Sequence, residues 1–195
     1  MIEYPAMLMV GASGKDAGKT ELACLLIRAF SPFLAIVGLK VSTLRDDFAG
    51  PAHQAYPTPS ESSAAPYLLA EEPAPGPGTD TARMLASGAR RSFLLRSDSS
   101  HLEQGFAAFR DRAGEAVIVC ESNSLRKLVR PGLFLVIQKF GDDALKPSFV
   151  EMAGYADRVV HTDGSRFDFG PENVVFEQGK WSLRTDAGTN HRVSP

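Results

Sequence analysis

The amino-acid sequence predicts an α/β fold with three layers, a mostly parallel central sheet and a C-terminal β-hairpin. Apolar runs alternate with amphipathic segments along most of the chain, as they do in folds built from strand–helix–strand units. The main apolar runs are continuous, which is typical of parallel strands buried on both faces. A glycine-rich stretch joins the first apolar run to the first amphipathic segment. These three observations favour a sheet with helices packed on it.

Length and composition limit the alternatives. A chain of 195 residues, with 44% hydrophobic residues and a net charge of -2, is expected to form one domain without a general attraction to nucleic acid or to acidic membranes. It contains no apolar run of the ~20 residues that a membrane span needs, and no basic region followed by a secretory core. We therefore expect a cytoplasmic protein. Cys24 and Cys120 each lie in an apolar run, which predicts buried, reduced thiols.

The first elements form a strand–helix–strand unit. The run "AMLMVGA" (6–12) predicts a central strand, and the helical spacing of Leu22, Leu25, Leu26 and Phe30 predicts a helix from Gly18 to the stop at Ser31 and Pro32. "FLAIVGLKV" (33–41) predicts the second strand. A strand, a glycine-rich turn, a helix and a strand in this order indicate a right-handed crossover.

A proline-rich segment interrupts this alternation. Seven of the thirteen prolines fall within residues 43–79, which we interpret as a mobile surface insertion with a short helical turn at "PYLLAEE" (66–72). The α/β domain is expected to cover residues 1–163, and a hairpin and tail (164–195) to pack on it.

The alternation resumes after the insertion. A helix capped by Thr79 or Asp80 should end at Gly88, because serine, threonine and aspartate favour helix starts and glycine favours helix ends. The remaining predicted elements are strands at 90–97, 115–122, 132–140 and 157–162, helices at 99–113 and 147–156, a hairpin at 173–185 that turns at Gln178-Gly179, and a frayed tail at 186–195.

The stretch "SGKDAGKT" (13–20) predicts a nucleotide-phosphate loop. It matches the pattern G-x-x-x-x-G-K-[ST] except that Ser13 replaces the leading glycine. Backbone N–H groups and a helix N-terminus would face the phosphates, Lys19 would reach the β- and γ-phosphates, and Thr20 would bind Mg²⁺. The alternative is a relic loop that binds a stray anion or nothing. The predicted nucleotide-binding residues of this loop are Ser13, Gly14, Lys15, Asp16, Ala17, Gly18, Lys19 and Thr20.

Two further charged residues end predicted strands at the edge where ligands bind in open α/β sheets. Glu121 is expected to bind Mg²⁺ or to polarise a water, with capping of the next turn as the alternative. Lys40 would contact the γ-phosphate or a substrate anion, or else face solvent. We take Lys19, Lys40 and Glu121 as the candidate catalytic residues and Thr20 and Glu121 as the metal ligands.

Other polar residues have weaker patterns. Gln138 and Lys139 follow a strand where a base pocket is expected, although "QKFGDD" does not match the guanine-reading pattern. Lys15 is read either as a solvated side chain or as one that crosses a dimer interface. The four histidines show no pairing at metal-ligand spacing, and the arginines form no aromatic-interleaved stripe for nucleic acid.

The order of these motifs resembles the molybdopterin-guanine dinucleotide biosynthesis adapter family (MobB-like P-loop proteins) and, more distantly, dethiobiotin synthetase. The likeness rests on "GASGKDAGKT", "VGLKVS", "DTARMLASGA" and "VIVCES", and it covers roughly residues 5 to 140. Glu121 matches the glutamate of the adapters' Glu-Gly pair, which here reads Glu121-Ser122-Asn123. The strand end "GLKVST" looks more like that of dethiobiotin synthetase, whose lysine lies near the phosphates.

The motifs and the resemblance together imply a P-loop protein that binds Mg²⁺ with GTP or ATP. The first hypothesis is an accessory protein with slow hydrolysis, in molybdenum-cofactor maturation. The second is an ATP-dependent small-molecule ligase or kinase, and the third is a non-catalytic scaffold that holds a nucleotide. A protein partner or a homodimer is compatible with each.

Overall fold

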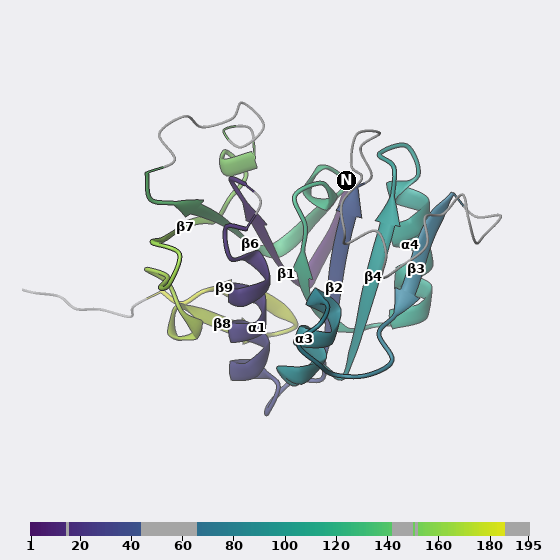
Figure 1. Cartoon of the computed structure of the whole chain (residues 1–195), viewed down its shortest axis with the longest axis horizontal. Coiled ribbons are helices and arrows are strands. Elements are labelled where there is room, and N and C mark those ends of the chain that lie inside the picture. Colours follow the sequence, from purple (N-terminus) through teal and green to yellow (C-terminus); the bar gives the residue numbers. More distant parts are fainter. Residues whose placement is uncertain (15, 44–65, 142–149, 151, 186–195) are drawn as a thin grey trace, which may run out of the picture.

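The structure, a computed structural model, describes residues 1–14, 16–43, 66–141, 150 and 152–185. Seven strands form one twisted sheet in which β3 pairs antiparallel with β4 and every other neighbouring pair is parallel (Figure 1). This is the α/β class that the sequence predicts, with a mostly parallel central sheet. In spatial order the strands are β3 (Tyr67–Glu71), β4 (Arg91–Ser97), β2 (Ile36–Thr43), β5 (Val117–Glu121), β1 (Ile2–Ala12), β6 (Val129–Lys139) and β7 (Arg158–Thr162).

Helices cover both faces of the sheet. Helices α1 (Lys19–Phe30) and α3 (Asp80–Ala86) pack on the face seen in Figure 1, and α4 (Leu102–Ala113) packs on the opposite face. Two short 3₁₀ turns, η2 (Leu125–Lys127) and η3 (Pro171–Asn173), join neighbouring elements. In the described part of the chain, no helix has the length and apolar character to cross a membrane.

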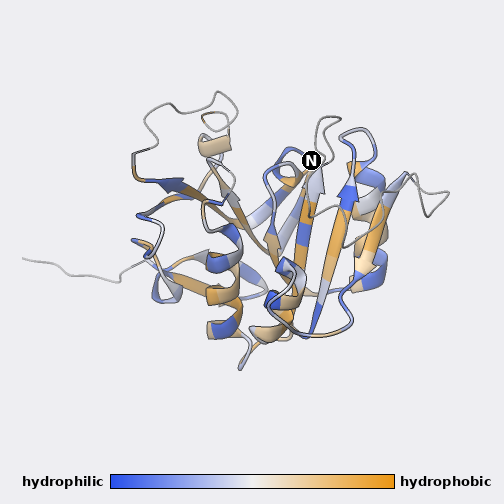
Figure 2. Cartoon of the chain, viewed as in Figure 1, coloured by the Kyte–Doolittle hydropathy of each residue, from blue (hydrophilic) through white to orange (hydrophobic). Residues whose placement is uncertain are grey.

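The core is divided into two clusters because the side chains of each strand alternate between the two faces. Figure 2 shows the hydrophobic colouring concentrated along the strands and on the inner sides of the helices. The cluster beneath α1 includes Leu8, Val10, Leu22, Leu26, Val119 and Leu135. The cluster beneath α4 includes Met7, Met9, Leu39, Phe93, Phe106 and Phe109. Both cysteines are buried free thiols, as predicted.

The C-terminal hairpin packs against the main sheet. Strands β8 (Val174–Glu177) and β9 (Lys180–Leu183) are antiparallel, and both turn residues, Gln178 and Gly179, have positive φ, as a tight hairpin turn requires. Trp181 is fully buried, and its indole N–H donates to Ala6 O at 3.1 Å. Its ring also makes an edge contact with Phe30 of α1, with 5.0 Å between centroids.

Most predicted elements are present, with shifted ends. Strand β1 begins at Ile2, and β2 begins at Ile36 because Phe33 lies in a turn with 82% of its surface exposed. The helical turn predicted at 66–72 is wrong, because residues 67–71 form the edge strand β3. Of the predicted segments, residues 44–65, 142–149, 151 and 186–195 lie outside the described residues.

Candidate nucleotide-phosphate site

The loop between β1 and α1 is anchored at its start by hydrogen bonds to two neighbouring segments. Ser13 N donates to Ile137 O at 2.8 Å, which ties the start of the loop to β6. The Asn123 side-chain amide makes two hydrogen bonds with the backbone of Ala12: its Oδ1 accepts from Ala12 N at 2.9 Å, and its Nδ2 donates to Ala12 O at 3.0 Å. The chain then turns through Asp16 and Gly18, which have φ of 58° and 89°. The loop is therefore held by the two strands on either side of β1.

Helix α1 starts at this loop with an open N-terminus. Its N-cap residue is Gly18, which has no side chain to bond the first N–H groups of the helix. Leu22 N closes the first turn onto Gly18 O at 3.0 Å. The N–H groups of a helix start and its macrodipole favour an anion in front of them. This is the local arrangement that the pattern in residues 13–20 predicts.

Five charged or hydroxyl side chains meet beside the loop. Thr20 Oγ1 donates to Glu121 Oε2 at 2.7 Å, and the Lys40 ammonium contacts Glu121 Oε1. Lys40 Nζ also lies 3.0 Å from Asp80 Oδ2, at the start of α3. Lys19 Nζ lies 3.3 Å from Gly14 O, to which it donates. Lys19, Thr20, Lys40 and Glu121, which the sequence predicts as site residues, thus lie together at one edge of the sheet.

The structure shows what Glu121 and Lys40 contact. Glu121 is 2% exposed, and its carboxylate bonds Thr20 and Lys40, while the turn that follows is capped by Ser122 Oγ on Leu125 N at 3.0 Å. Glu121 is therefore not the cap of that turn. The Lys40 side chain is 21% exposed and lies against two carboxylates, so it does not simply face solvent.

The electrostatics of the cluster differ between its two lysines. Burial lowers the pKa of Lys19, and the more distant charge of Glu121 only partly opposes this. Burial would also lower the pKa of Lys40, but the attraction of Glu121 and Asp80 outweighs it, so its pKa is raised. Burial would raise the pKa of Asp80, yet Lys40 and the Thr20 hydroxyl hold it below its ordinary value. Lys40 is thus firmly charged, whereas Lys19 lacks a strong partner for its charge.

The donor set fits a hard divalent cation that is bound together with a nucleotide. Within the described residues, no group of three or more His, Cys, Asp or Glu side chains could hold a metal ion. Mg²⁺ at nucleotide sites usually takes one or two carboxylates and completes its coordination with phosphate and water oxygens. The Thr20 hydroxyl and the carboxylates of Asp80 and Glu121 are oxygen donors of this kind.

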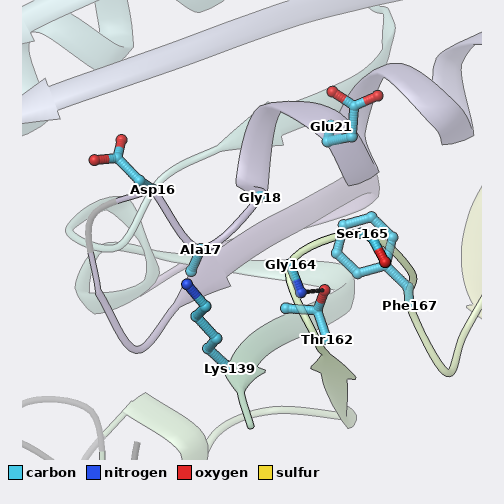
Figure 3. A pocket seen from close by; sticks show the side chains of 9 residues that line it. All are labelled: Asp16, Ala17, Gly18, Glu21, Lys139, Thr162, Gly164, Ser165 and Phe167. Carbon is cyan, nitrogen blue, oxygen red and sulfur yellow. Dashed lines mark hydrogen bonds between the residues drawn. The ribbon is translucent and has the colours of Figure 1, made fainter. Parts of the chain in front are cut away.

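A small pocket lies on the other side of the loop (Figure 3). It is lined by Asp16, Ala17, Gly18, Glu21, Lys139, Thr162, Gly164, Ser165 and Phe167. Figure 3 shows the Lys139 side chain reaching toward Ala17 and the Phe167 ring close to the start of α1. Gln138, which the sequence analysis placed with Lys139, is not among the lining residues, because successive side chains of a strand point to opposite faces. Lys15 lies outside the described residues.

Sequence reasoning missed two residues of the site. The sequence places Asp80 only as a candidate helix cap and within the phrase "DTARMLASGA", whereas its carboxylate contacts Lys40. Thr79 caps α3 instead: its hydroxyl accepts from Ala82 N at 3.0 Å. Asn123 bonds the backbone at the start of the loop. An acid in the first turn of a helix and an amide two residues after a strand-end glutamate were the available signals.

Comparisons with known proteins give little further identification. No protein-family model matches the chain, and no curated protein matches it. Among solved structures, the chain is similar to a crystal structure of LpxK from Aquifex aeolicus in complex with ATP, with a TM-score of 0.47 and 14% sequence identity. The superposition covers 84% of this chain and 50% of that one, so the chain spans half the length of the protein it matches.

Proposed function

We propose that this protein binds Mg²⁺ with a nucleoside triphosphate, ATP or GTP, and hydrolyses it slowly. The observation that carries the proposal is the hydrogen bond of 2.7 Å between the Thr20 hydroxyl and the Glu121 carboxylate, beside Lys19 and an uncapped helix start. Each of these groups has a role in triphosphate binding that its chemistry fits. Together with Lys40 and Asp80, these groups converge from strands β2 and β5 and from the starts of helices α1 and α3. This convergence supports a functional site over a chance match to an eight-residue pattern.

Each residue of the site would bind the part of Mg·nucleotide that its charge fits. Backbone N–H groups of the loop and of the first turn of α1 would bind the phosphates, and Lys19 would neutralise the β- and γ-phosphates. Thr20, Asp80 and Glu121 would hold Mg²⁺, which when bound polarises the phosphoryl oxygens and neutralises the charge that develops on them. The pocket around Lys139 and Phe167 is close enough to the loop to receive part of the nucleoside.

Isothermal titration calorimetry with Mg·ATP and Mg·GTP tests this proposal. We expect binding heat for the wild type with at least one nucleotide, and its loss in Lys19→Ala, whose folded state is checked by circular dichroism. Lys180→Ala is the matched control, because Lys180 is an exposed lysine on the hairpin strand β9. The proposal is wrong if neither nucleotide binds, or if Lys19→Ala binds as tightly as the control.

A second candidate function is phosphoryl transfer or ligation on a small acid. Two cationic side chains on one face of the sheet favour it: Lys40 on β2, and Arg96 on β4, which is paired with Ser42 and is only 7% exposed. A carboxylate or phosphate substrate could bind there, next to the γ-phosphate. This candidate predicts that a mixture of small carboxylic acids accelerates nucleotide turnover and that Lys40→Met removes the acceleration. Turnover that no acid changes would exclude it.

The finer assignments rest on the sequence resemblance and on general expectation. A role in molybdenum-cofactor maturation predicts that deleting the gene lowers molybdoenzyme activity and that the Lys19→Ala variant fails to restore it. The scaffold alternative, with a protein partner or a homodimer, predicts instead that Lys19→Ala still binds the partner in a pull-down. We also propose a cytoplasmic location, where ATP and GTP are available; fractionation tests it.

A further inference from the structure

We propose that the Lys40 ammonium occupies the place of the metal between Asp80 and Glu121 in the nucleotide-free protein, so that a divalent cation enters only by displacing it. The inference rests on the proposed function for the identity of the metal ligands. It goes further by giving Lys40 a defined role and by predicting an order: the metal arrives with the nucleotide, not before it.

The contacts of the three candidate ligands support this role. One oxygen of Glu121 accepts from Lys40, and the other accepts from Thr20 at 2.7 Å. Asp80 Oδ2 lies 3.0 Å from the same ammonium. The Lys40 ammonium therefore lies against both carboxylates, where a cation shared by Asp80 and Glu121 would have to lie. A metal ion cannot be bound by both carboxylates at this place until the ammonium has left it.

The charge balance points the same way. Lys40 and the two carboxylates together carry one net negative charge, and Glu121 is almost completely buried. A divalent ion added to this group would be repelled by an ammonium only a few ångströms away, an interaction that is strong where water is largely excluded. A triphosphate brings several negative charges at once and gives the displaced ammonium a new partner. Binding of the metal ion alone is thus disfavoured, whereas binding of the metal ion together with the nucleotide is favoured.

Lys40 is also able to move. Its ammonium is a compact charge on a flexible stem of four carbons, and its side chain keeps 21% of its surface exposed. It lies in the C-terminal half of β2, beside the metal ligands, so a rotation of its side chain could carry the charge from the two acids to the terminal phosphate. Displacement therefore requires no movement of the sheet.

Metal titration of the nucleotide-free protein tests the inference directly. Mn²⁺, which takes the same carboxylate ligands as Mg²⁺, is followed by its free-ion electron paramagnetic resonance signal. We expect the wild type and the control Lys180→Met to bind Mn²⁺ weakly, and Lys40→Met to bind it at least about tenfold more tightly. Adding Asp80→Asn to Lys40→Met should remove this gain. Mn²⁺ should also raise the melting temperature of Lys40→Met more than that of the wild type.

Further variants make each outcome decisive. Lys40→Gln removes the charge but keeps a hydrogen-bond donor, so it serves if Lys40→Met does not fold; it should bind Mn²⁺ more tightly than the wild type as well. The inference fails if neither variant binds Mn²⁺ more tightly than the wild type, or if Lys180→Met gains as much. Calorimetry with Mg·ATP and Mg·GTP separates the two proposals. If the wild type binds nucleotide in a Lys19-dependent way while Lys40 variants show no gain in Mn²⁺ affinity, only this inference is lost.

Discussion

Replacement of Gly18 by alanine should destabilise the protein and disable the phosphate loop. Gly18 has φ of 89°, and an added Cβ would lie 3.0 Å from Phe167 Cζ. The left-handed backbone costs a non-glycine residue roughly 1–2 kcal/mol. The contact adds less, because the far end of the Phe167 ring has only to shift by a few tenths of an ångström. We therefore expect Gly18→Ala to lower the free energy of unfolding by about 2 kcal/mol.

Gly14, in the same loop, provides the matched control. No atom lies within 4 Å of a Cβ built at Gly14, and its φ is not in the left-handed region. Gly14→Ala should therefore change the stability by no more than about 0.5 kcal/mol, or increase it slightly, because alanine restricts the unfolded chain. Equilibrium urea unfolding measures both variants, and calorimetry with Mg·nucleotide measures the loop.

A third variant separates the two parts of the cost. Phe167→Leu combined with Gly18→Ala should recover only the contact part, once the effect of Phe167→Leu alone is subtracted in a double-mutant cycle. The reasoning is refuted if Gly18→Ala and Gly14→Ala unfold at the same urea concentration. It is also refuted if the double variant recovers the whole loss, since the backbone conformation would then cost nothing.

Three further predictions concern the residues around the loop. Because burial lowers the pKa of Lys19, the folded protein disfavours the charged form of this side chain. Lys19→Met should therefore raise the free energy of unfolding at pH 7 by about 1 kcal/mol, although nucleotide binding is lost. Calorimetry at several pH values should show this gain in stability shrink as the pH rises through the pKa of Lys19 in the folded protein. The pKa of Asp80 is held below its ordinary 3.8, so its stabilisation is present above that pH and is lost as the pH falls through the folded pKa. Since Asp80 is 38% exposed, Asp80→Asn should cost only about 1 kcal/mol in urea unfolding at pH 7, and the difference from the wild type should disappear in acid; a constant difference would contradict this. Asn123→Asp keeps the acceptor for Ala12 N but not the donor to Ala12 O, so it should lower the free energy of unfolding by about 1 kcal/mol. Asn123→Ala removes both hydrogen bonds and should lower it by about 2 kcal/mol. Hydrogen exchange of the Ala12 amide should become faster only in the alanine variant.

The strands and helices that the sequence predicted correctly have local signals. The run at residues 6–12 is apolar without interruption because β1 is central and buried on both faces, and the spacing of Leu22 and Leu26 follows the buried side of α1. The segment 66–72 lacked such a signal. Its Leu, Ala and Glu residues favour helix, yet main-chain pairing with β4 makes residues 67–71 a strand. Pairing between segments distant in sequence overrides local preference, and sequence periodicity does not report it.

In the site, too, some residues could be predicted from local sequence patterns, whereas others depend on how distant segments pack together. Lys40 and Glu121 could be placed at one edge because parallel strands present their carboxyl ends together, and the two residues are indeed register partners on β2 and β5. The contact of Asp80 with Lys40 depends on how α3 lies on the sheet, which follows from packing around Met84 and not from any motif. The bonds of Asn123 to Ala12 depend likewise on the pairing of β5 with β1.

The serine at the head of the loop now has a physical explanation. A leading glycine is needed only where the chain takes a conformation that other residues avoid. Among the described residues, the non-glycine positions with positive φ are Asp16 and Gln178, so Ser13 is not strained. Its N–H instead continues the pairing with β6, and the left-handed turns fall on Asp16, a residue type that tolerates them, and on Gly18. The loop thus keeps its shape without the leading glycine because its strain lies three and five residues later.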